Sequence, residues 1–279
     1  MTVRQEITPE LRAWIIEQAS AGHSVPSVLD SMKASGWDEE VALQAVEETL
    51  AAEVEQRKLS QSIVPEVVGA PDASTVWAHD KWVKVVLRLK HPRVVVFNDF
   101  LSVDECEALK VEATSRLARS ETVQNTSGGS EVNESRTSQG MFFRRGESEL
   151  CQRIEARIAA LVNWPIENGE GIQVLRYAPG AEYKPHYDYF DPAQPGTASI
   201  LKRGGQRVGT VVMYLNTPEQ GGATVFPDVG LEVHAVQGNA VFFAYGVPTP
   251  ATLTLHGGAP VVQGEKWVAT KWMRERAFE

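Results

Sequence analysis

Two residue types that bind metal ions occur one residue apart in an aromatic segment of the chain. The segment 183–190 has the sequence YKPHYDYF and contains His186 and Asp188. In a β-strand, alternate side chains project to the same face, so the two Cα atoms would lie about 6.5 Å apart and both side chains could bind one ion. A histidine bonded to a neighbouring strand and an aspartate at the start of a turn would give the same pattern, so this pair alone does not identify a metal site.

A third ligand must come from a distant part of the chain. Three of the six histidines precede the strand-rich region, which leaves His234 and His256 as candidates. His256 lies ten residues before Lys266, in a segment KWVATKW that is expected to be a strand. Alternation places Lys266 on one face with Thr270 and Trp272, and that face of the strand carries no acidic residue. An unpaired buried ammonium group is strongly unfavourable, so we expect an anionic ligand to pair with this lysine.

Two histidines and one carboxylate would occupy one face of an octahedral metal ion and leave three positions open. Such a donor set is typical of non-haem Fe(II), which must bind a cosubstrate and oxygen together. Structural zinc sites have four protein ligands, often including cysteine. Cys106 and Cys151 are both far from these histidines in sequence. The residues therefore favour an iron site with His186, Asp188 and a second histidine as ligands.

The composition predicts a folded protein with one large domain, or with a large and a small one. The chain has 279 residues, of which 43% are hydrophobic and 23% charged, and its net charge is −9. This charge disfavours nucleic acid and anionic membranes as partners. No apolar run approaches the roughly 20 residues of a membrane span, and the first residues lack the pattern of a secretory signal. The two cysteines are expected to be reduced, and the predicted compartment is the cytoplasm.

Residues 1–58 are predicted to form a small module of three short helices. Thr8 and Pro9 suit the start of the first helix, and Asp38 precedes the segment that we expect to form the third. The stretch SMKASGWDEEVALQAVEETL resembles a ubiquitin-associated-type bundle. A DNA-binding helix-turn-helix is the alternative, but these residues include 11 acidic and 5 basic side chains. We expect a packing module or one that binds a protein partner.

Residues 59–80 contain prolines, glycines and small residues and are predicted to be a linker, followed by a domain at 81–279. This domain is predicted to begin with strands, continue with helices near 103–117 and 147–164, and end with many short strands. ATLTLH, at 251–256, is expected to be one of these strands. The polar segment 121–135 is expected to be a mobile loop that closes over a bound peptide. Short strands at regular spacing predict an α+β fold, with a double-stranded β-helix (jelly roll) core and flanking helices.

The region from about 90 to 276 resembles the catalytic domain of prolyl 4-hydroxylases, which are Fe(II)- and 2-oxoglutarate-dependent dioxygenases. The segments that carry the resemblance are HPRVVVFNDFLS, ESRTSQGMFF, ENGEGIQVLRYAPGAEYKPHYDYF, QRVGTVVMYLN, GGATVFP and HGGAPVVQGEKWVATKWMRER. The resemblance implies that His186, Asp188 and His256 bind iron and that Lys266 pairs with the distal carboxylate of 2-oxoglutarate. Positions that match cosubstrate contacts are Tyr177 and Thr224. Positions that match the peptide groove or the mouth of the active site are Arg136, Glu170, Tyr183, Arg207 and Trp272, and we expect Arg207 and Tyr183 to serve in catalysis.

The implied reaction is the 4-hydroxylation of peptidyl proline, coupled to the decarboxylation of 2-oxoglutarate to succinate. Its cofactors would be Fe(II), 2-oxoglutarate and O2, with ascorbate as a reductant. Two alternatives stay open: a hydroxylase of free amino acids or other small molecules, and a non-catalytic sensor of iron and 2-oxoglutarate. Stimulation of succinate formation by a proline-rich peptide would distinguish the three.

Overall fold

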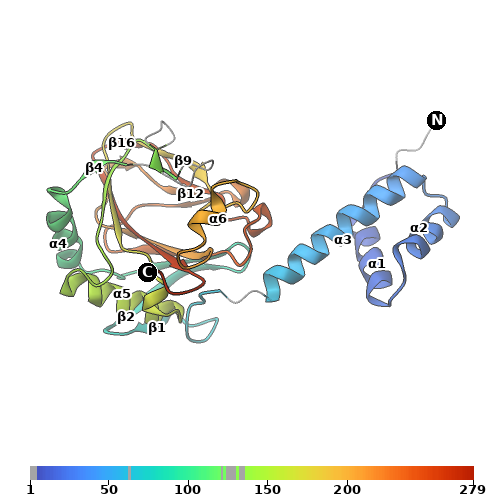
Figure 1. The fold of residues 1–279 in the computed structure, drawn as a ribbon, viewed down its shortest axis with the longest axis horizontal. Helices are drawn as coiled ribbons and strands as arrows, with labels where there is room; N and C mark the ends of the chain where they lie inside the picture. The colour runs from blue at the N-terminus through green and yellow to red at the C-terminus, as the bar shows by residue number, and fades with distance from the viewer. Residues whose placement is uncertain (1–4, 62–63, 121, 124–129, 132–135) are drawn as a thin grey trace. The chain divides into compact units, whose positions relative to one another are not determined.

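The computed structural model describes residues 5–61, 64–120, 122–123, 130–131 and 136–279. The chain divides into two compact units, Met1–Ser62 and Ile63–Glu279, each with its own core (Figure 1). Within the described ranges, none of the helices combines the length and the apolar character that a membrane span requires. Most of the segment 121–135, predicted to be a mobile loop, lies outside the described residues.

The first unit is the predicted three-helix module. Its helices are α1 (Pro9–Ser20), α2 (Val25–Ala34) and α3 (Glu39–Gln61). The Thr8 side chain accepts a hydrogen bond from the backbone N–H of Leu11, so the predicted N-cap is confirmed. Ile15, Met32 and Val46 are almost fully buried and bring one residue from each helix into a common apolar core.

The segment 59–80, predicted to be a linker, is largely part of the second unit. The backbone N–H groups of Glu66 and Val68 donate to Val162 and Leu161 at the end of a helix of the second unit. A strand, β1 (Thr75–Ala78), follows before position 80. The prolines and glycines of this segment suggested a linker. However, Val67, Val76 and Ala78 are buried in the core of the second unit, and this burial fixes the backbone of the segment.

The second unit is built on a nine-stranded antiparallel sheet. Its order is β1, β2 (Lys81–Leu89), β3 (Arg93–Asn98), β14 (Ala240–Ala244), β10 (Arg207–Tyr214), β17 (Lys266–Arg274), β8 (Gln173–Tyr177), β7 (Gln139–Phe142) and β4 (Ala118–Arg119). A four-stranded sheet has the order β13 (Leu231–Val233), β12 (Thr224–Phe226), β15 (His256–Gly258) and β9 (Tyr183–His186). Two strand pairs are smaller: β11 (Gln220–Gly221) with β16 (Val261–Gln263), and β5 (Thr122–Val123) with β6 (Ser130–Glu131).

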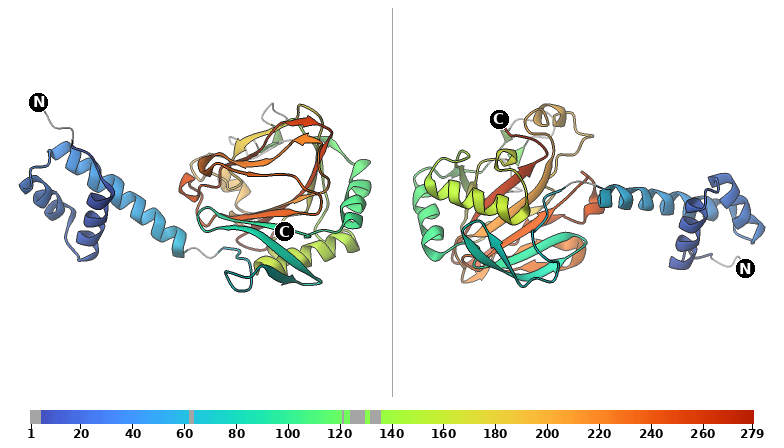
Figure 2. Two further views of the ribbon diagram at one scale, coloured as in Figure 1. Left: turned by 180° about the vertical axis from the view of Figure 1, so that it is seen from behind. Right: turned by 90° about the horizontal axis from the view of Figure 1, so that it is seen from below.

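Within its described residues, the second unit contains two long helices and several short ones. They are α4 (Val103–Thr114), α5 (Glu149–Val162), the short α6 (Thr197–Ile200) and the 3-10 turns η1 (Ile166–Asn168), η2 (Pro227–Val229) and η3 (Pro250–Thr252). Figure 2 shows α4 and α5 on one side of the large sheet and the smaller sheet on the other. Ser102 and Glu105 form a capping box at the start of α4. Cys106 and Cys151 are free thiols buried between these helices and the sheet.

The two sheets face each other across a second core, which is rich in tyrosine. Its buried members include Tyr177, Tyr214 and Phe243 from the large sheet, and Tyr245, which directly follows β14. This arrangement is the predicted jelly roll with flanking helices. One predicted strand is wrong, because residues 251–255 form a 3-10 turn and an irregular segment before β15. Leu253 there has a φ of 53°, which a strand does not allow.

Candidate active site

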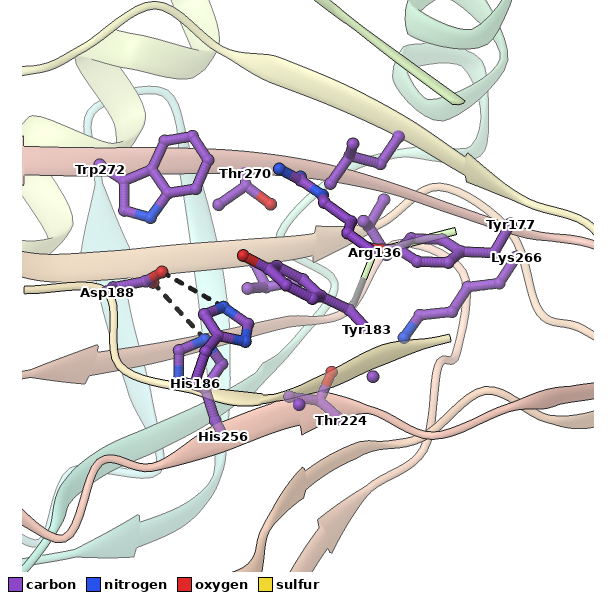
Figure 3. Close-up of a pocket in the computed structure, with 15 residues that line it drawn as sticks. Arg136, Tyr177, Tyr183, His186, Asp188, Thr224, His256, Lys266, Thr270 and Trp272 are labelled. Carbon is purple, nitrogen blue, oxygen red and sulfur yellow. Dashed lines mark ion pairs between the residues drawn. The ribbon is translucent and has the colours of Figure 1, made fainter. Parts of the chain in front are cut away.

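Three candidate metal ligands converge between the two sheets. His186 ends β9 and His256 begins β15, and the two residues are direct partners in the antiparallel pairing. Nε2 of His186 lies 3.5 Å from Oδ1 of Asp188, and Nε2 of His256 lies 3.5 Å from Oδ2 (Figure 3). The potential ligand atoms of the three residues all lie within 4.8 Å of one another. The structure thus brings together the set that the sequence suggested, whereas His234, the alternative, is exposed and outside this cluster.

Backbone carbonyls orient both imidazoles toward the same point. Nδ1 of His186 lies 2.9 Å from the carbonyl oxygen of Lys184, and Nδ1 of His256 lies 3.0 Å from that of Thr254. A carbonyl can only accept, so each Nδ1 carries the proton and donates it. Each Nε2 is therefore left with a free lone pair, as a metal ligand requires.

Asp188 reaches the site from a bend rather than from a strand. The sequence predicted that one strand would hold both His186 and Asp188, but β9 ends at His186 and the next residues turn away from the ladder. Burial raises the pKa of the Asp188 carboxyl, but the two histidines and Arg207 outweigh it and hold the pKa well below its usual range. Burial lowers the pKa of His256 to about 4. An anionic carboxylate and a neutral imidazole are the forms that bind a metal ion.

Lys266 brings a buried cationic group to the same pocket. It is 3% exposed, and its Nζ lies 5.5 and 5.9 Å from the ring centroids of Tyr177 and Tyr214. Desolvation by burial lowers its pKa to about 8. Within the described part of the chain, no carboxylate forms an ion pair with this lysine. The interior thus contains a cation that an anionic ligand would neutralise, as predicted from the sequence.

The pocket extends between the metal-ligand set and Lys266. Figure 3 shows these at opposite ends, with Tyr183 and Thr224 between them. Val268, Thr270 and Trp272 line the pocket together with Lys266, which confirms the predicted alternation along β17. Tyr177 lies directly opposite Lys266 in the pairing of β8 with β17. The hydroxyl of Tyr214 donates to Thr224 Oγ1 at 2.8 Å, which leaves the Thr224 hydroxyl proton free for a ligand.

Three residues predicted to contact the substrate also line the pocket. The ring of Tyr183 stacks on His186 with a centroid separation of 3.7 Å, and burial raises the pKa of Tyr183 to about 12. The guanidinium carbon of Arg136 lies 4.8 Å from the Tyr183 ring centroid, and its Nη2 donates to Gln173 at 2.8 Å. The indole N–H of Trp272 is buried and has no hydrogen-bond partner within the described residues.

Arg207 and Glu170, also predicted to contact substrate, do not line the pocket; they lie beside it, bonded to each other. Arg207 Nε and Nη2 donate to the Glu170 carboxylate at 2.7 and 2.9 Å. The Arg207 guanidinium lies 4.1 Å from the ring centroid of Trp272, and its Nη1 is 3.5 Å from the backbone oxygen of Asp188. Arg274 donates to Glu170 from the other side at 2.6 Å. These contacts indicate that the cluster supports Trp272 and the Asp188 backbone.

Sequence reasoning missed three residues. Thr210 donates to Asp188 Oδ2 at 2.7 Å, and its own hydroxyl oxygen lies 2.8 Å from the hydroxyl of Tyr245. Phe142 is 51% exposed and lies 6.4 Å, centroid to centroid, from Trp272, which lines the pocket. The alternation within RVGTVVMYLN places Thr210 on the inner face, but the sequence contains no signal for its pairing with Asp188.

The donor chemistry fits the metal and cosubstrate suggested by the sequence. The set of two histidines and a carboxylate, with neutral imidazoles and an ionised carboxylate, suits Fe(II). The uncompensated Lys266 ammonium suits a dicarboxylate at the other end of the pocket. A family model described as the 2OG-Fe(II) oxygenase superfamily matches residues 172–274. This range contains Lys266 and the three candidate metal ligands, His186, Asp188 and His256. Fold and site together define a 2-oxoglutarate- and Fe(II)-dependent oxygenase.

Similar proteins narrow this class. The chain is 40% identical over 223 residues to prolyl 4-hydroxylase 5 of Arabidopsis thaliana. The aligned region covers 72% of this chain and 74% of the relative. It is 42% identical over 227 residues to prolyl 4-hydroxylase 1 of the same plant, with 72% and 78% covered. The 2OG complex of the viral collagen prolyl hydroxylase from Paramecium Bursaria Chlorella virus-1 matches with a TM-score of 0.50 and 31% identity, over 65% of this chain and 95% of that one. The chain therefore belongs to the prolyl 4-hydroxylase family.

Proposed function

We propose that this protein hydroxylates proline residues of a polypeptide at C4, with 2-oxoglutarate and O2 as cosubstrates. One oxygen atom of O2 enters the new hydroxyl group and the other enters succinate, with release of CO2. The observation that carries the proposal is a single pocket with the donor set of His186, Asp188 and His256 at one end and the unpaired Lys266 ammonium at the other.

The residues of this pocket have separate roles in the proposal. His186, Asp188 and His256 would hold Fe(II), which when bound supplies the redox chemistry that couples decarboxylation to hydroxylation. Lys266 pairs with the distal carboxylate of 2-oxoglutarate. Tyr177 and Thr224 line the same pocket, and their hydroxyl groups would donate hydrogen bonds to the cosubstrate.

The substrate contacts come from three other residues that line the pocket. Tyr183 packs against His186 and limits the space in which a proline ring can lie near the metal ligands. The free N–H of Trp272 can donate to a backbone carbonyl of a polypeptide. Arg136 lies beside Tyr183 and fixes its ring. Arg207, with Glu170, acts through Trp272 and Asp188, and we therefore assign both as positioning residues rather than as substrate contacts.

The remaining expectations concern the surroundings of the enzyme. We propose that the helical module at residues 5–61 binds a protein partner, because it has a core of its own. We propose the cytoplasm as the compartment, because each cysteine is packed in the core as a thiol. Ascorbate is the proposed reductant that keeps the iron ferrous.

The experiment that tests the function is a substrate screen with two readouts. The full-length protein is incubated with Fe(II), 2-oxoglutarate, ascorbate and proline-rich peptides, and succinate and peptide mass are measured. The expected result is peptide-stimulated succinate release together with a mass gain of one oxygen on proline. Stimulation by free amino acids alone would show a small-molecule hydroxylase instead. No stimulation by any compound, with iron and 2-oxoglutarate still bound, would show a non-catalytic sensor.

A further inference from the structure

A chain of two hydroxyl groups ends on the carboxylate of Asp188. Thr210 Oγ1 lies 2.7 Å from Asp188 Oδ2, and Tyr245 Oη lies 2.8 Å from Thr210 Oγ1. Thr210 is 0% exposed, Tyr245 2% and Asp188 7%, so water does not compete for these bonds.

The direction of both hydrogen bonds follows from the chemistry of the acceptor. A carboxylate that binds a metal is ionised and can only accept, so the Thr210 hydroxyl must donate to it. The Thr210 oxygen then has only lone pairs to offer, so the Tyr245 hydroxyl must donate to Thr210. Every proton in the chain points toward Asp188, and each donor polarises the next.

The backbone explains why Asp188 needs such support. The two histidines are held by the pairing of β9 with β15, but Asp188 lies in the bend beyond β9 and has no partner in that ladder. Thr210 lies in the middle of β10, with β14 and β17 paired on either side. Tyr245 directly follows β14, and its N–H donates to the carbonyl of Val208 on β10. The hydroxyl chain thus links a residue in a bend to the most constrained part of the large sheet.

We propose that Thr210 and Tyr245 are positioning residues that fix the orientation of the Asp188 carboxylate for metal binding. The proposal rests on the metal site assigned under the proposed function. Oδ2 lies near His256 and Oδ1 near His186, so a rotation of the carboxylate would misplace both oxygens relative to the imidazoles. Losing the hydrogen bond to a ligating side chain costs about 10- to 100-fold in metal affinity.

The test is metal affinity measured without turnover. Co(II) is titrated into the metal-free full-length protein, and binding is followed by calorimetry and by the visible absorption of the bound ion. Thr210→Val keeps the shape of the side chain but removes the donor, and the expected result is a loss of affinity of about 10- to 100-fold. Thr210→Ser keeps the donor and should restore most of the affinity. Tyr245→Phe should cause a smaller loss, because the Thr210 donor is retained.

Thr49→Val is the matched control. Thr49 is 2% exposed and accepts a hydrogen bond from Arg12 in the helical unit, and it does not line the pocket. Its replacement should lower thermal stability without changing the affinity for Co(II). Unfolding curves of the metal-free variants show whether each protein is folded. If Thr210→Val does not fold, Tyr245→Phe decides the matter by the same measurement.

Two failures can be told apart. A wild-type protein that binds no divalent metal would overturn the metal site and the proposed function with it. A wild-type protein that binds Co(II), with affinity unchanged in both Thr210→Val and Tyr245→Phe, would overturn only the positioning role. Equal losses in Thr210→Val and Thr210→Ser would also overturn it, because the hydroxyl would then not be the relevant group.

Discussion

The replacement of Lys266 by alanine is the most direct test of the cosubstrate assignment. In the wild-type protein the ammonium group is 3% exposed and has no carboxylate partner within the described residues. If it pairs with the distal carboxylate of 2-oxoglutarate, Lys266→Ala leaves that anion in an interior of low polarity. The protein itself should tolerate the change, because it removes a buried charge that forms no ion pair with any part of the chain that the structure describes.

The magnitude follows from the burial of this pair. Removal of one partner of a buried, hydrogen-bonded charge pair costs roughly 2–5 kcal/mol. At about 1.4 kcal/mol for each factor of ten, the affinity for 2-oxoglutarate should fall roughly 30- to several-thousand-fold. Lys266→Arg should recover only part of this loss, because a planar guanidinium does not replace a point charge in a fitted pocket.

The assay is the dependence of succinate release on 2-oxoglutarate concentration, with metal content measured in parallel. Metal affinity should be retained, because the three metal ligands are unchanged. Lys110→Ala serves as the control, since Lys110 is a surface residue of α4 that pairs with Glu107. An apparent 2-oxoglutarate affinity in Lys266→Ala equal to that of the control would refute the assignment and leave a metal site of unknown use.

Three further outcomes are expected. Replacement of His186, Asp188 or His256 by alanine should abolish turnover and measurable metal binding, because three ligands leave none to spare; near-normal activity in His256→Ala would show that the wrong histidine was chosen. The affinity for 2-oxoglutarate should fall by up to about tenfold per pH unit above pH 8. The free protein loses the Lys266 proton with a pKa of about 8, whereas binding of the anion requires that proton. A constant affinity from pH 7 to 10 would contradict the pairing. Phe142→Ala should raise the KM for long peptides several-fold at constant kcat, because its ring is exposed and lies beside Trp272. An equal effect on the KM for free proline would mean that Phe142 does not contact a polypeptide.

Local sequence determined most of the elements and a large part of the site. Capping residues mark the starts of α1 and α4, and short runs rich in β-branched and aromatic residues mark β10, β14 and β17. Alternation along β17 also placed Lys266 on an inner face without an acidic neighbour. These features depend on residues a few positions apart, so the chain itself encodes them.

Contacts between distant segments decided the remainder. Residues 59–80 were predicted to be a linker because of their prolines and glycines, yet Val67, Val76 and Ala78 are buried in the core of the second unit. The strand that was expected to hold Asp188 stops at His186, and the carboxylate is oriented instead by Thr210, 22 residues later, and through it by Tyr245. Arg207 and Glu170 resembled substrate contacts, but the fold pairs them beside Trp272. Spacing along the chain determines which face a side chain takes, whereas its partner on another strand depends on sheet register, which only the folded structure fixes.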